Sequence, residues 1–517
     1  MENTTGNISI IQKDISSLRH PQARYNGLNP GSVVLDKGSQ KTPRSRPLQV
    51  DTIWERDIIV SLRDGIQLRA DIFRPQNATE KIPILLVWTP YGKSGTGMFS
   101  MELVQARDGI PEEMLSGYEC FEGPDPAEWN LHQYAVAHVD ARGCFKSQGD
   151  HVWHGTTEGL DGYDTIEFLS QFEWSNGRVA LIGNSWLATS QWFIAAERPP
   201  HLACILPLEG LSDVYRETLC RGGVPYLPFW TFLRDNGLYG ENKQEDVIAM
   251  VERHPLMNKY WEDKRAKAHL IEVPAYVLAT QSPLVNIPFS SWPPEKTVYE
   301  RYYLADDDVL HQRNSSEIGS VSYQSDVPAM QMDNDSEEVM FKHTFTQKTT
   351  VVGSSKAILF MSCPDHDDLD IFVQLRKLDR NGKVLQNINI PLQDLGVKSD
   401  EVDDINVLKY LGPTGVLRAS HRALDTHLSK PHWPMHDHAN PRKITPGQVV
   451  RVEIGIWPAA IQFEAGEGIS LKVSGHQMIL AEFAPLRGLF KNGNKGRHVV
   501  HFGGDFASHI LIPTVSF

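Results

Sequence analysis

The sequence predicts two domains, an α/β domain followed by an all-β domain. In the first half, strands that are apolar along their whole length alternate with helical patterns, which is typical of a parallel sheet covered on both faces. From about residue 292 the pattern changes to short alternating segments separated by turn residues, which is typical of a β-sandwich or jelly roll. The length of 517 residues allows two or three domains. We therefore expect an α/β domain over 51–291 and a β domain over 292–517.

The bulk composition excludes several classes of protein. Asp and Glu (64) exceed Lys and Arg (50), and a net charge of −14 argues against a nucleic-acid binder or a protein of anionic membrane surfaces. The five cysteines are scattered without C-x-x-C spacing, so neither a disulfide framework nor a zinc site is expected. No apolar run reaches the length of a membrane span, and the first residues lack a signal-peptide profile. These features favour a cytoplasmic protein.

Residues 1–50 are polar and rich in Gly, Ser, Lys and Pro, and we expect an arm that lies loosely on the body or is disordered. The α/β domain then begins with a hairpin whose strands, Arg56–Leu62 and Ile66–Phe73, flank an Asp-Gly turn. Buried strands are predicted over Ile82–Trp88 and Tyr134–Val139, and a helix is predicted over Gly159–Gln171.

The stretch from 178 to 196 carries the main functional signal. An apolar run, Val179–Ile182, ends at Gly183, and a helical pattern starts at Trp186, so Ser185 lies in a tight strand-to-helix turn. This arrangement is typical of a nucleophile elbow, which exposes a serine hydroxyl at the carboxyl end of a sheet. The structural alternative is an N-cap serine, because serine is common at that position.

The elbow is followed by a short strand, His201–Pro207, and by a helical, aromatic-rich stretch over about 210–270. That stretch predicts either a cap that forms a substrate pocket or a plain packing layer. Ile271–Ala279 then predicts one more buried strand. In the β domain, strands are expected at Val339–Thr346, Ala357–Met361, Leu369–Arg376, Val449–Ile456, Gly468–Val473 and His498–Phe502.

Several of these segments resemble the CocE/NonD hydrolases, the cocaine-esterase-like relatives of X-Pro dipeptidyl peptidases. The resemblance covers roughly residues 50–517. It rests on Thr89–Lys93, on Asp140–Gly143 with Ser147 and Gly149, on Trp174–Trp186, on Leu256–Lys264 and Ile271–Ala275, and on Leu417–Arg422 and His498–Gly504. It implies an α/β-hydrolase core with a helical cap, followed by a C-terminal jelly-roll domain.

The resemblance also implies the catalytic residues. Ser185 matches the acylated serine, Tyr91 matches a tyrosine of the oxyanion hole, and the backbone N–H of Trp186 matches the second donor. One nucleophile and two donors aimed at the developing oxyanion are what ester or amide cleavage requires. Tyr91 has a structural alternative as a buried aromatic at the end of a strand. No metal or organic cofactor is implied.

One part of the family pattern is absent. A serine hydrolase needs a histidine base and an acid, and relatives place both after the strand that starts near Val273. Here the segment 275–292 runs almost directly into the β domain and contains no Asp, Glu or His. The chain could have lost hydrolytic power, could use a base from elsewhere, or could be a shortened splice form or gene model of an active enzyme. In subtilisin, loss of the triad histidine lowers kcat by about a million-fold.

Other acid and histidine clusters have structural explanations that we favour. We expect Asp306–Asp308 with His311 to form a solvated turn, His432–His438 to belong to a jelly-roll loop, and Cys363–Asp368 to form a polar loop. We expect His138 to be a satisfied core histidine, and Asp140 and Arg142 to form a structural ion pair.

Two functions from different classes follow. The first is a serine hydrolase, or acyltransferase, of a small-molecule ester, amide or thioester through a Ser185 acyl-enzyme. The second is a catalytically impaired relative that binds a small apolar ligand or serves as an interaction protein. We expect no nucleic-acid or membrane partner, and the sequence leaves a homo-oligomer open.

Overall fold

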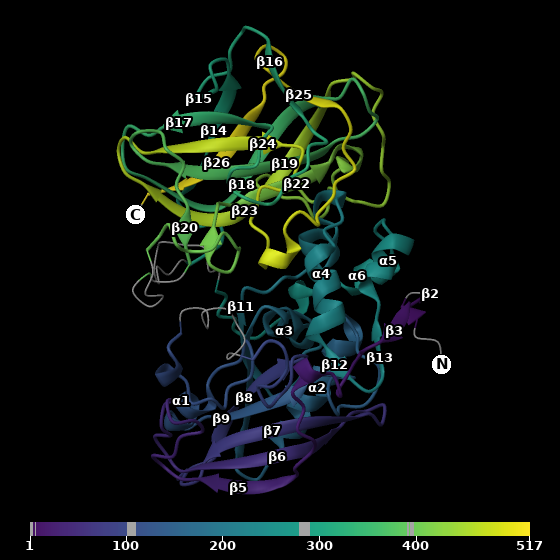
Figure 1. Cartoon of the computed structure of the whole chain (residues 1–517), viewed down its shortest axis with the longest axis vertical. Helices are drawn as coiled ribbons and strands as arrows, with labels where there is room; N and C mark the ends of the chain where they lie inside the picture. The colour runs from purple at the N-terminus through teal and green to yellow at the C-terminus, as the bar shows by residue number, and fades with distance from the viewer. Residues whose placement is uncertain are drawn as a thin grey trace. The chain divides into compact units, whose positions relative to one another are not determined.

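The computed structural model describes residues 4–5, 7–100, 110–278, 290–389, 392 and 398–516. The chain divides into two compact units (Figure 1). The first comprises Met1–Thr218 with Trp230–Thr280, and the second comprises Leu219–Phe229 with Gln281–Phe517. A short segment from the predicted cap region is therefore part of the second unit.

Within the described residues, the first unit holds a seven-stranded sheet in the order β11-β10-β8-β9-β7-β6-β5. Four neighbouring strands, β9, β8, β10 and β11, run parallel, whereas β7, β6 and β5 add an antiparallel side. The sequence predicts all of these strands except β5. Their bounds are β5 Gly31–Leu35, β6 Thr52–Ser61, β7 Gln67–Pro75, β8 Ile82–Thr89, β9 Ala135–Asp140, β10 Ser175–Asn184 and β11 Leu202–Leu208.

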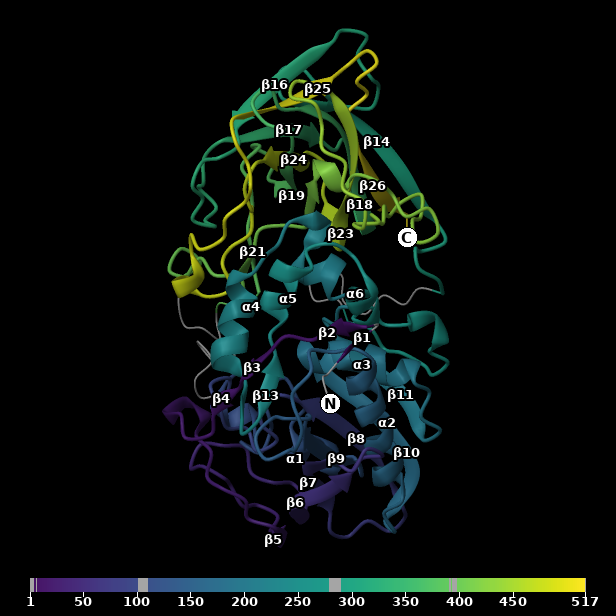
Figure 2. The ribbon, with the colours of Figure 1, turned by 90° about the vertical axis from the view of Figure 1, so that its right-hand side faces the viewer.

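Two helices, α2 (Thr156–Ser170) and α3 (Trp186–Ala196), lie beside one another and pack on β10 and β8 (Figure 2). Small residues permit this approach, because a Cβ built at Gly162 of α2 would lie 2.4 Å from the side chain of Ile194 in α3. A shorter helix, α1 (Pro126–Leu131), precedes β9 and packs on it and on β7.

The strand order places a topological switch point between β8 and β10. The chain leaves β8 for β9 on one side and returns through α2 to β10 on the other side. In open α/β sheets, ligands bind at such a point, outside the carboxyl ends of the strands. Here the residues just beyond those ends are Tyr91 and Ser185.

The N-terminal arm differs from the expectation of a loose segment. β5 pairs with β6 as the edge strand of the sheet, β3 (Gln12–Asp14) pairs with β13 (Lys243–Glu245), and β4 (Ser16–Ser17) pairs with β12 (Tyr239–Gly240). Backbone pairing with exposed strand edges orders this polar segment, and a hydrophobicity pattern cannot show such pairing.

The stretch over 210–270 contains short helical segments, as the sequence predicts. They are a π-helical turn at Tyr215–Leu219, α4 at Pro228–Phe232, a second π-helical turn at Leu233–Gly237, α5 at Val247–Arg253 and α6 at Lys259–Asp263.

The strand predicted over Ile271–Ala279 is wrong for the described part of that range, which ends at residue 278. Only two isolated parallel bridges form there, Ile205 with Ala275 and Leu208 with Leu278. Tyr276 and Val277 are 57% and 60% exposed, because no further described strand covers them.

The second unit is rich in strands, as predicted. Within the described residues, its main sheet runs in the order β16-β25-β18-β26-β14-β15-β17-β24-β19-β22, and β23 also pairs with β18. The strand bounds are β14 Thr297–Ala305, β15 Val309–His311, β16 Gly319–Gln324, β17 Glu338–Thr344, β18 Thr349–Ser362, β19 Asp370–Leu378, β22 Thr414–Arg418, β23 Val450–Phe463, β24 Gly468–Ser474, β25 Arg497–Phe502 and β26 His509–Val515. A small pair, β20 (Asn387–Ile388) and β21 (Lys409–Tyr410), lies apart from it.

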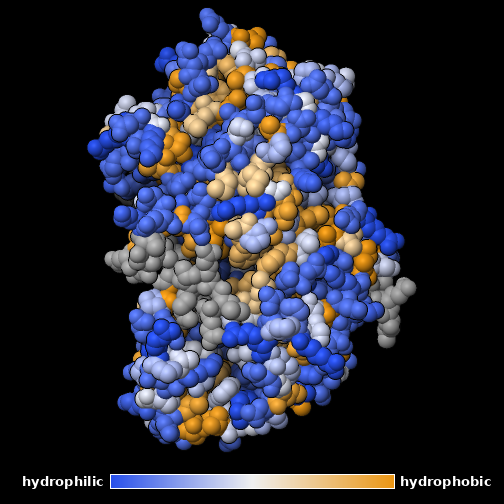
Figure 3. All heavy atoms as spheres, viewed as in Figure 1, coloured by the Kyte–Doolittle hydropathy of each residue, from blue (hydrophilic) through white to orange (hydrophobic). Residues whose placement is uncertain are grey.

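The face seen in Figure 3 is largely hydrophilic, with apolar residues in scattered patches. All five cysteines are free, and four of them are buried. In the part of the chain that the structure describes, no helix is both long and apolar enough to cross a membrane.

Candidate active site

Ser185 lies on the turn between β10 and α3 in a strained conformation, with φ 54° and ψ −114°. A positive φ is uncommon for a residue other than glycine, and such strain is concentrated at functional sites. The residue is exposed, and its hydroxyl does not cap α3, so the N-cap explanation fails. Gly183 makes the turn sterically feasible, because a Cβ there would lie 2.5 Å from the Cβ of Leu187.

The backbone around Ser185 is fixed on both sides. Its N–H donates to the carbonyl of Leu208 at the end of β11 (3.0 Å), and its carbonyl accepts from Ala188 and Thr189 (3.1 and 2.9 Å). α3 therefore starts directly at the serine. The first N–H groups of a helix have no intrahelical acceptor, and the helix dipole favours negative charge there. The N–H of Trp186 is thus available to an oxyanion formed beside the serine.

Tyr91 follows β8 and is 6% exposed. Its N–H donates to the hydroxyl of Thr89 (3.0 Å), and its ring lies edge-on to Phe99, Phe121 and Trp186, with centroid separations of 5.3, 5.4 and 6.5 Å. Burial raises the pKa of the Tyr91 phenol well above its usual value. The hydroxyl therefore stays protonated and can act as a hydrogen-bond donor.

The Trp186 ring is held by a buried carboxylate. Glu158 accepts from the indole N–H groups of Trp186 (3.2 Å) and Trp88 (3.0 Å), and one of its oxygens lies 2.7 Å from His154. The His154 ring lies against Trp186 and Phe193, with centroids at 4.3 and 5.7 Å. Although burial opposes ionisation, His154 holds the pKa of Glu158 below its usual value. This network fixes the start of α3 and hence the residue next to the serine.

Glu209 is a candidate that the sequence analysis missed. It directly follows β11, with φ 59°, and the side chain of Asn184, the residue before the serine, is near enough to influence its carboxyl. Although Glu209 as a whole residue is exposed, desolvation of its carboxyl raises its pKa above the usual value. Local sequence does not show this position, because it depends on β11 lying beside β10 in the sheet.

Within the described ranges, the Ser185 hydroxyl makes no hydrogen bond to a histidine or to any other side chain. Most of the linker 275–292, namely residues 279–289, lies outside the described residues. Its lack of Asp, Glu and His is a fact of the sequence alone.

Two of the structural explanations concern residues of the first unit. His138 is fully buried, its Nδ1 lies 3.0 Å from the carbonyl of Lys93, and burial lowers its pKa to about 4, as for a neutral core histidine. The predicted ion pair between Asp140 and Arg142 is wrong. Arg142 instead reaches Asp161 on α2 (2.6 Å), whereas Asp140 accepts the backbone N–H of Lys93 (2.6 Å). Asp140 is the last residue of β9, whereas Arg142 lies in the turn that follows and reaches α2.

The clusters in the second unit do not form a described catalytic or metal centre. Asp306–Asp308 forms an exposed turn between β14 and β15, as expected for a solvated turn. His421 and His438 approach each other to 2.9 Å through their Nδ1 atoms. Across the described ranges of the chain, no group of three or more His, Cys, Asp or Glu side chains could hold a metal ion.

Two family models match the chain. The model described as X-Pro dipeptidyl-peptidase (S15 family) matches residues 64–244, and the model of the X-Pro dipeptidyl-peptidase C-terminal non-catalytic domain matches residues 265–511. Together they span both units. They support an α/β-hydrolase core followed by a β domain.

Individual proteins agree with these matches. The cocaine esterase of Rhodococcus sp. is 29% identical over 213 residues, which are 39% of this chain and 33% of that protein. The chain thus spans about a third of the length of this curated relative.

Solved structures give wider coverage. A CocE/NonD family hydrolase from Staphylococcus aureus has a TM-score of 0.79 and 26% identity, covering 97% of this chain and 99% of that one. An aminopeptidase from a marine sediment archaeon, Thaumarchaeota archaeon, has a TM-score of 0.63 at 16% identity, covering 93% and 98%, and shows the fold alone. Taken together, these matches support a CocE/NonD-like, X-Pro dipeptidyl-peptidase-like family for the chain.

Proposed function

We propose that the chain is a serine hydrolase, or an acyltransferase, that acts on a small ester, amide or thioester through a Ser185 acyl-enzyme. The observation that carries this proposal is the strained elbow itself. Ser185 is exposed at the switch point of the sheet, its hydroxyl is not used as a helix cap, and Tyr91 and the start of α3 flank it. A strained turn that served only the fold would have no need to expose this hydroxyl.

In this mechanism the Ser185 Oγ attacks the acyl carbon and forms a C–O bond while its proton passes to a base. The negative charge on the former carbonyl oxygen is stabilised by the N–H of Trp186 and the hydroxyl of Tyr91. Collapse of this intermediate breaks the bond to the alcohol, amine or thiol, which leaves with the proton. Water, or an acceptor alcohol or amine, then releases the acyl group by the reverse sequence.

We further propose that Glu209 supplies the base that the linker lacks. It follows β11, and the last residue of that strand accepts a hydrogen bond from the backbone N–H of the serine. A carboxylate with a raised pKa is a stronger base than an ordinary glutamate, and a base with a pKa near the working pH is the most effective. Glu209 would thus replace the histidine base that the linker lacks.

Other parts of the proposal rest on the resemblance. We propose a jelly-roll topology for the β domain, and a cap formed by the helical segments over 210–270 that contributes to the acyl pocket. The mechanism needs neither a metal nor an organic cofactor.

A second function, a catalytically impaired relative that binds small ligands, is favoured by one observation. The segment 275–292, where relatives carry the acid and the histidine, contains no Asp, Glu or His. Without any base, Ser185 would be nearly inert.

The two functions are separated by hydrolysis of p-nitrophenyl butyrate, measured for wild type and Ser185→Ala. The hydrolase predicts turnover that the substitution abolishes. The impaired relative predicts equal, background rates for both proteins.

A further inference from the structure

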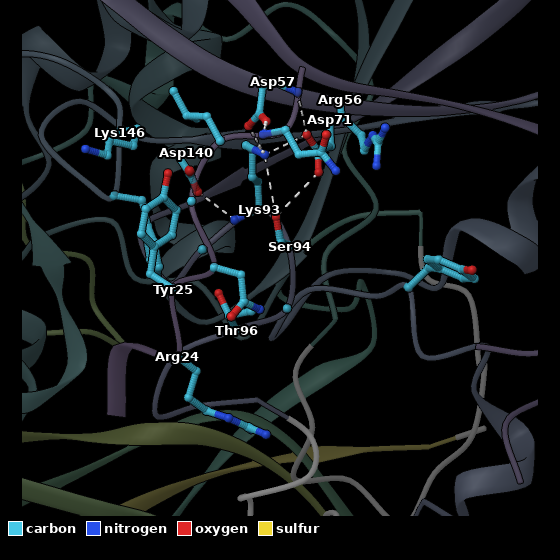
Figure 4. Close-up of a pocket in the computed structure, with 18 of the residues that line it drawn as sticks. Arg24, Tyr25, Arg56, Asp57, Asp71, Lys93, Ser94, Thr96, Asp140 and Lys146 are labelled. Atoms are coloured by element: carbon cyan, nitrogen blue, oxygen red, sulfur yellow. Dashed lines mark hydrogen bonds and ion pairs between the residues drawn. The ribbon is translucent and has the colours of Figure 1, made fainter. Parts of the chain in front are cut away.

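A concave site lies in the first unit, apart from Ser185. A cavity of about 520 Å³ is enclosed by the N-terminal segment 24–29, by β6 and β7, and by the turn 92–96 that follows Tyr91 (Figure 4). Neither Ser185, Trp186 nor Glu209 lines it. The volume is within the range of small-molecule sites.

The floor of this cavity carries buried charges. The Lys93 ammonium contacts Asp57 (2.8 Å) and Asp71 (2.6 Å), and the Lys93 backbone N–H donates to Asp140 (2.6 Å), as Figure 4 shows. All four residues are at most 7% exposed. One ammonium cannot neutralise three carboxylates, and burial raises the pKa of Asp140 to about 7. A buried excess of negative charge is costly and is relieved by an added cationic group.

An irregular and strained stretch of backbone determines where Asp57 lies. The register of β6 and β7 shifts between Glu55 and Ile58, which is a β-bulge, and Asp57 has φ 54°. Its N–H donates to Asp71 (2.9 Å), and its carboxylate accepts the N–H of Asn29 (2.5 Å). Bulges re-aim side chains and are frequent beside binding sites. Here the bulge aims a carboxylate at the cavity.

The walls are aromatic and contain unsatisfied polar atoms. Trp54 stacks on Phe73 (centroids 5.4 Å apart) and meets Tyr118 edge-on (5.7 Å). Three buried atoms of lining side chains have no hydrogen-bond partner among the described residues: Tyr25 Oη, Trp54 Nε1 and Arg56 Nε. The rings of Trp54, Phe73 and Tyr118 give this side of the cavity an apolar surface.

Cationic side chains complete the lining of the cavity, and they are less buried than the floor. They are Arg24, Lys41, Arg56 and Lys146, of which Lys146 also pairs with Glu241 (2.5 Å). In Figure 4 the side chain of Arg56 lies beside Asp71 and that of Lys146 lies on the side of Asp140, whereas Arg24 lies farther from Asp57, Asp71 and Lys93. The cavity is therefore negative at its floor and positive around it.

We propose that this cavity binds a small zwitterion of the amino-acid type, with its ammonium at Asp57 and Asp140, its carboxylate at the cationic rim and its apolar group against the Trp54 wall. A simple anion would be repelled by the floor carboxylates, and a simple cation would be repelled by the rim. The Lys93 ammonium already occupies the position between the carboxylates that a metal ion would need. A zwitterion carries a positive group for the floor carboxylates and a negative group for the cationic rim.

The test uses isothermal titration calorimetry of the full chain with three probes of similar size. L-phenylalanine carries both charges, 3-phenylpropanoate lacks the ammonium, and phenethylamine lacks the carboxylate. We expect binding of L-phenylalanine only, unchanged in Ser185→Ala. Unchanged binding in Ser185→Ala would show that the cavity binds L-phenylalanine independently of the proposed catalytic serine.

Two substitutions locate the binding. Asp57→Asn removes charge from the floor, and Arg24→Gln removes charge from the rim, at an exposed residue whose side chain also donates to Ser100 (2.9 Å). Each should weaken L-phenylalanine binding by about 10–100-fold, the range for a charged hydrogen bond. Asp36→Asn and Arg19→Gln, at exposed positions outside the cavity, should leave it unchanged.

The proposal is overturned if L-phenylalanine does not bind at millimolar concentration. It is equally overturned if either singly charged probe binds as tightly, or if Arg24→Gln binds like wild type. The probe comparison and Arg24→Gln stay informative even if Asp57→Asn fails to fold.

Discussion

The backbone N–H of Ser185 donates to the carbonyl of Leu208 at 3.0 Å, which joins the elbow after β10 to the last residue of β11. The next residue, Glu209, consequently stands at the same edge of the sheet as the nucleophile. Asn184, the residue before the serine, is near enough to the Glu209 carboxyl to influence its pKa. These contacts bring a carboxyl with a raised pKa to the elbow of a chain whose linker lacks the usual acid and histidine.

The substitution Glu209→Gln should lower kcat for p-nitrophenyl butyrate by about 10²–10⁴-fold, the range for loss of a general base. The carboxylate is the active form, so wild-type kcat/KM should rise with pH through the raised pKa of Glu209. This limb of the pH profile should vanish in the variant. Steady-state kinetics over a range of pH measures both effects.

The matched control is Glu173→Gln, an exposed glutamate between α2 and β10. It should keep the wild-type rate and profile. A Glu209→Gln enzyme with an unchanged pH profile would show that Glu209 only supports the turn.

The Glu158 network should contribute strongly to stability. Glu158→Gln removes the charge that pairs with His154 inside the core, and the free energy of unfolding should fall by about 3 kcal/mol. Urea unfolding measures the loss. Glu128→Gln breaks two partly exposed ion pairs, with His132 (3.1 Å) and with Arg46 (2.6 Å), and should cost less than about 1 kcal/mol. Equal effects of the two substitutions would contradict the role of the buried network.

The elbow glycine should be nearly irreplaceable. Gly183→Ala places a Cβ 2.5 Å from Leu187 at a φ of +153°, and it should destabilise the fold by about 2–3 kcal/mol. Gly382→Ala serves as the comparison, because Gly382 has a positive φ of +76° but open space around it. This substitution introduces backbone strain without crowding and should destabilise the fold by about 1 kcal/mol. If thermal unfolding finds the two variants equally stable, crowding at the elbow is not the reason for Gly183.

Asp140 should make stability depend on pH. Its pKa is about 7 when folded, against an ordinary value of 3.8, so between these values the folded state binds more protons than the unfolded state. Stability should therefore fall as pH rises from about 4 to about 7. Asp140→Asn should flatten this slope in urea unfolding at several pH values, whereas the exposed Asp36→Asn should retain it. An unchanged slope in Asp140→Asn would assign the effect to other groups.

Much of the fold could be predicted because the strands of a covered parallel sheet are apolar throughout. β8, β9, β10 and β11 all lie close to the predicted ranges. β5 was missed because it joins the sheet through backbone pairing at an edge, where its side chains need no hydrophobic pattern. The strand predicted over Ile271–Ala279 was wrong for its described part, because only two isolated bridges join that segment to β11.

The candidate site was predictable in part. Gly183, Ser185 and the helix start form a local signature within a few residues, so sequence spacing suffices for them. The position of Glu209 depends on which strands are neighbours, and the Arg142 pairing depends on where α2 lies, so neither follows from local sequence. The cavity near Asp57 depends on a bulge and on the N-terminal segment, which no local pattern indicates.

The Ser185 acyl-enzyme is tested most directly by labelling the purified protein with a fluorophosphonate probe, followed by intact mass measurement of wild type, Ser185→Ala and Glu209→Gln. We predict one probe per wild-type chain, none on Ser185→Ala, and much slower labelling of Glu209→Gln. Folded wild-type protein that takes up no probe would contradict the acyl-enzyme mechanism and favour a ligand-binding relative.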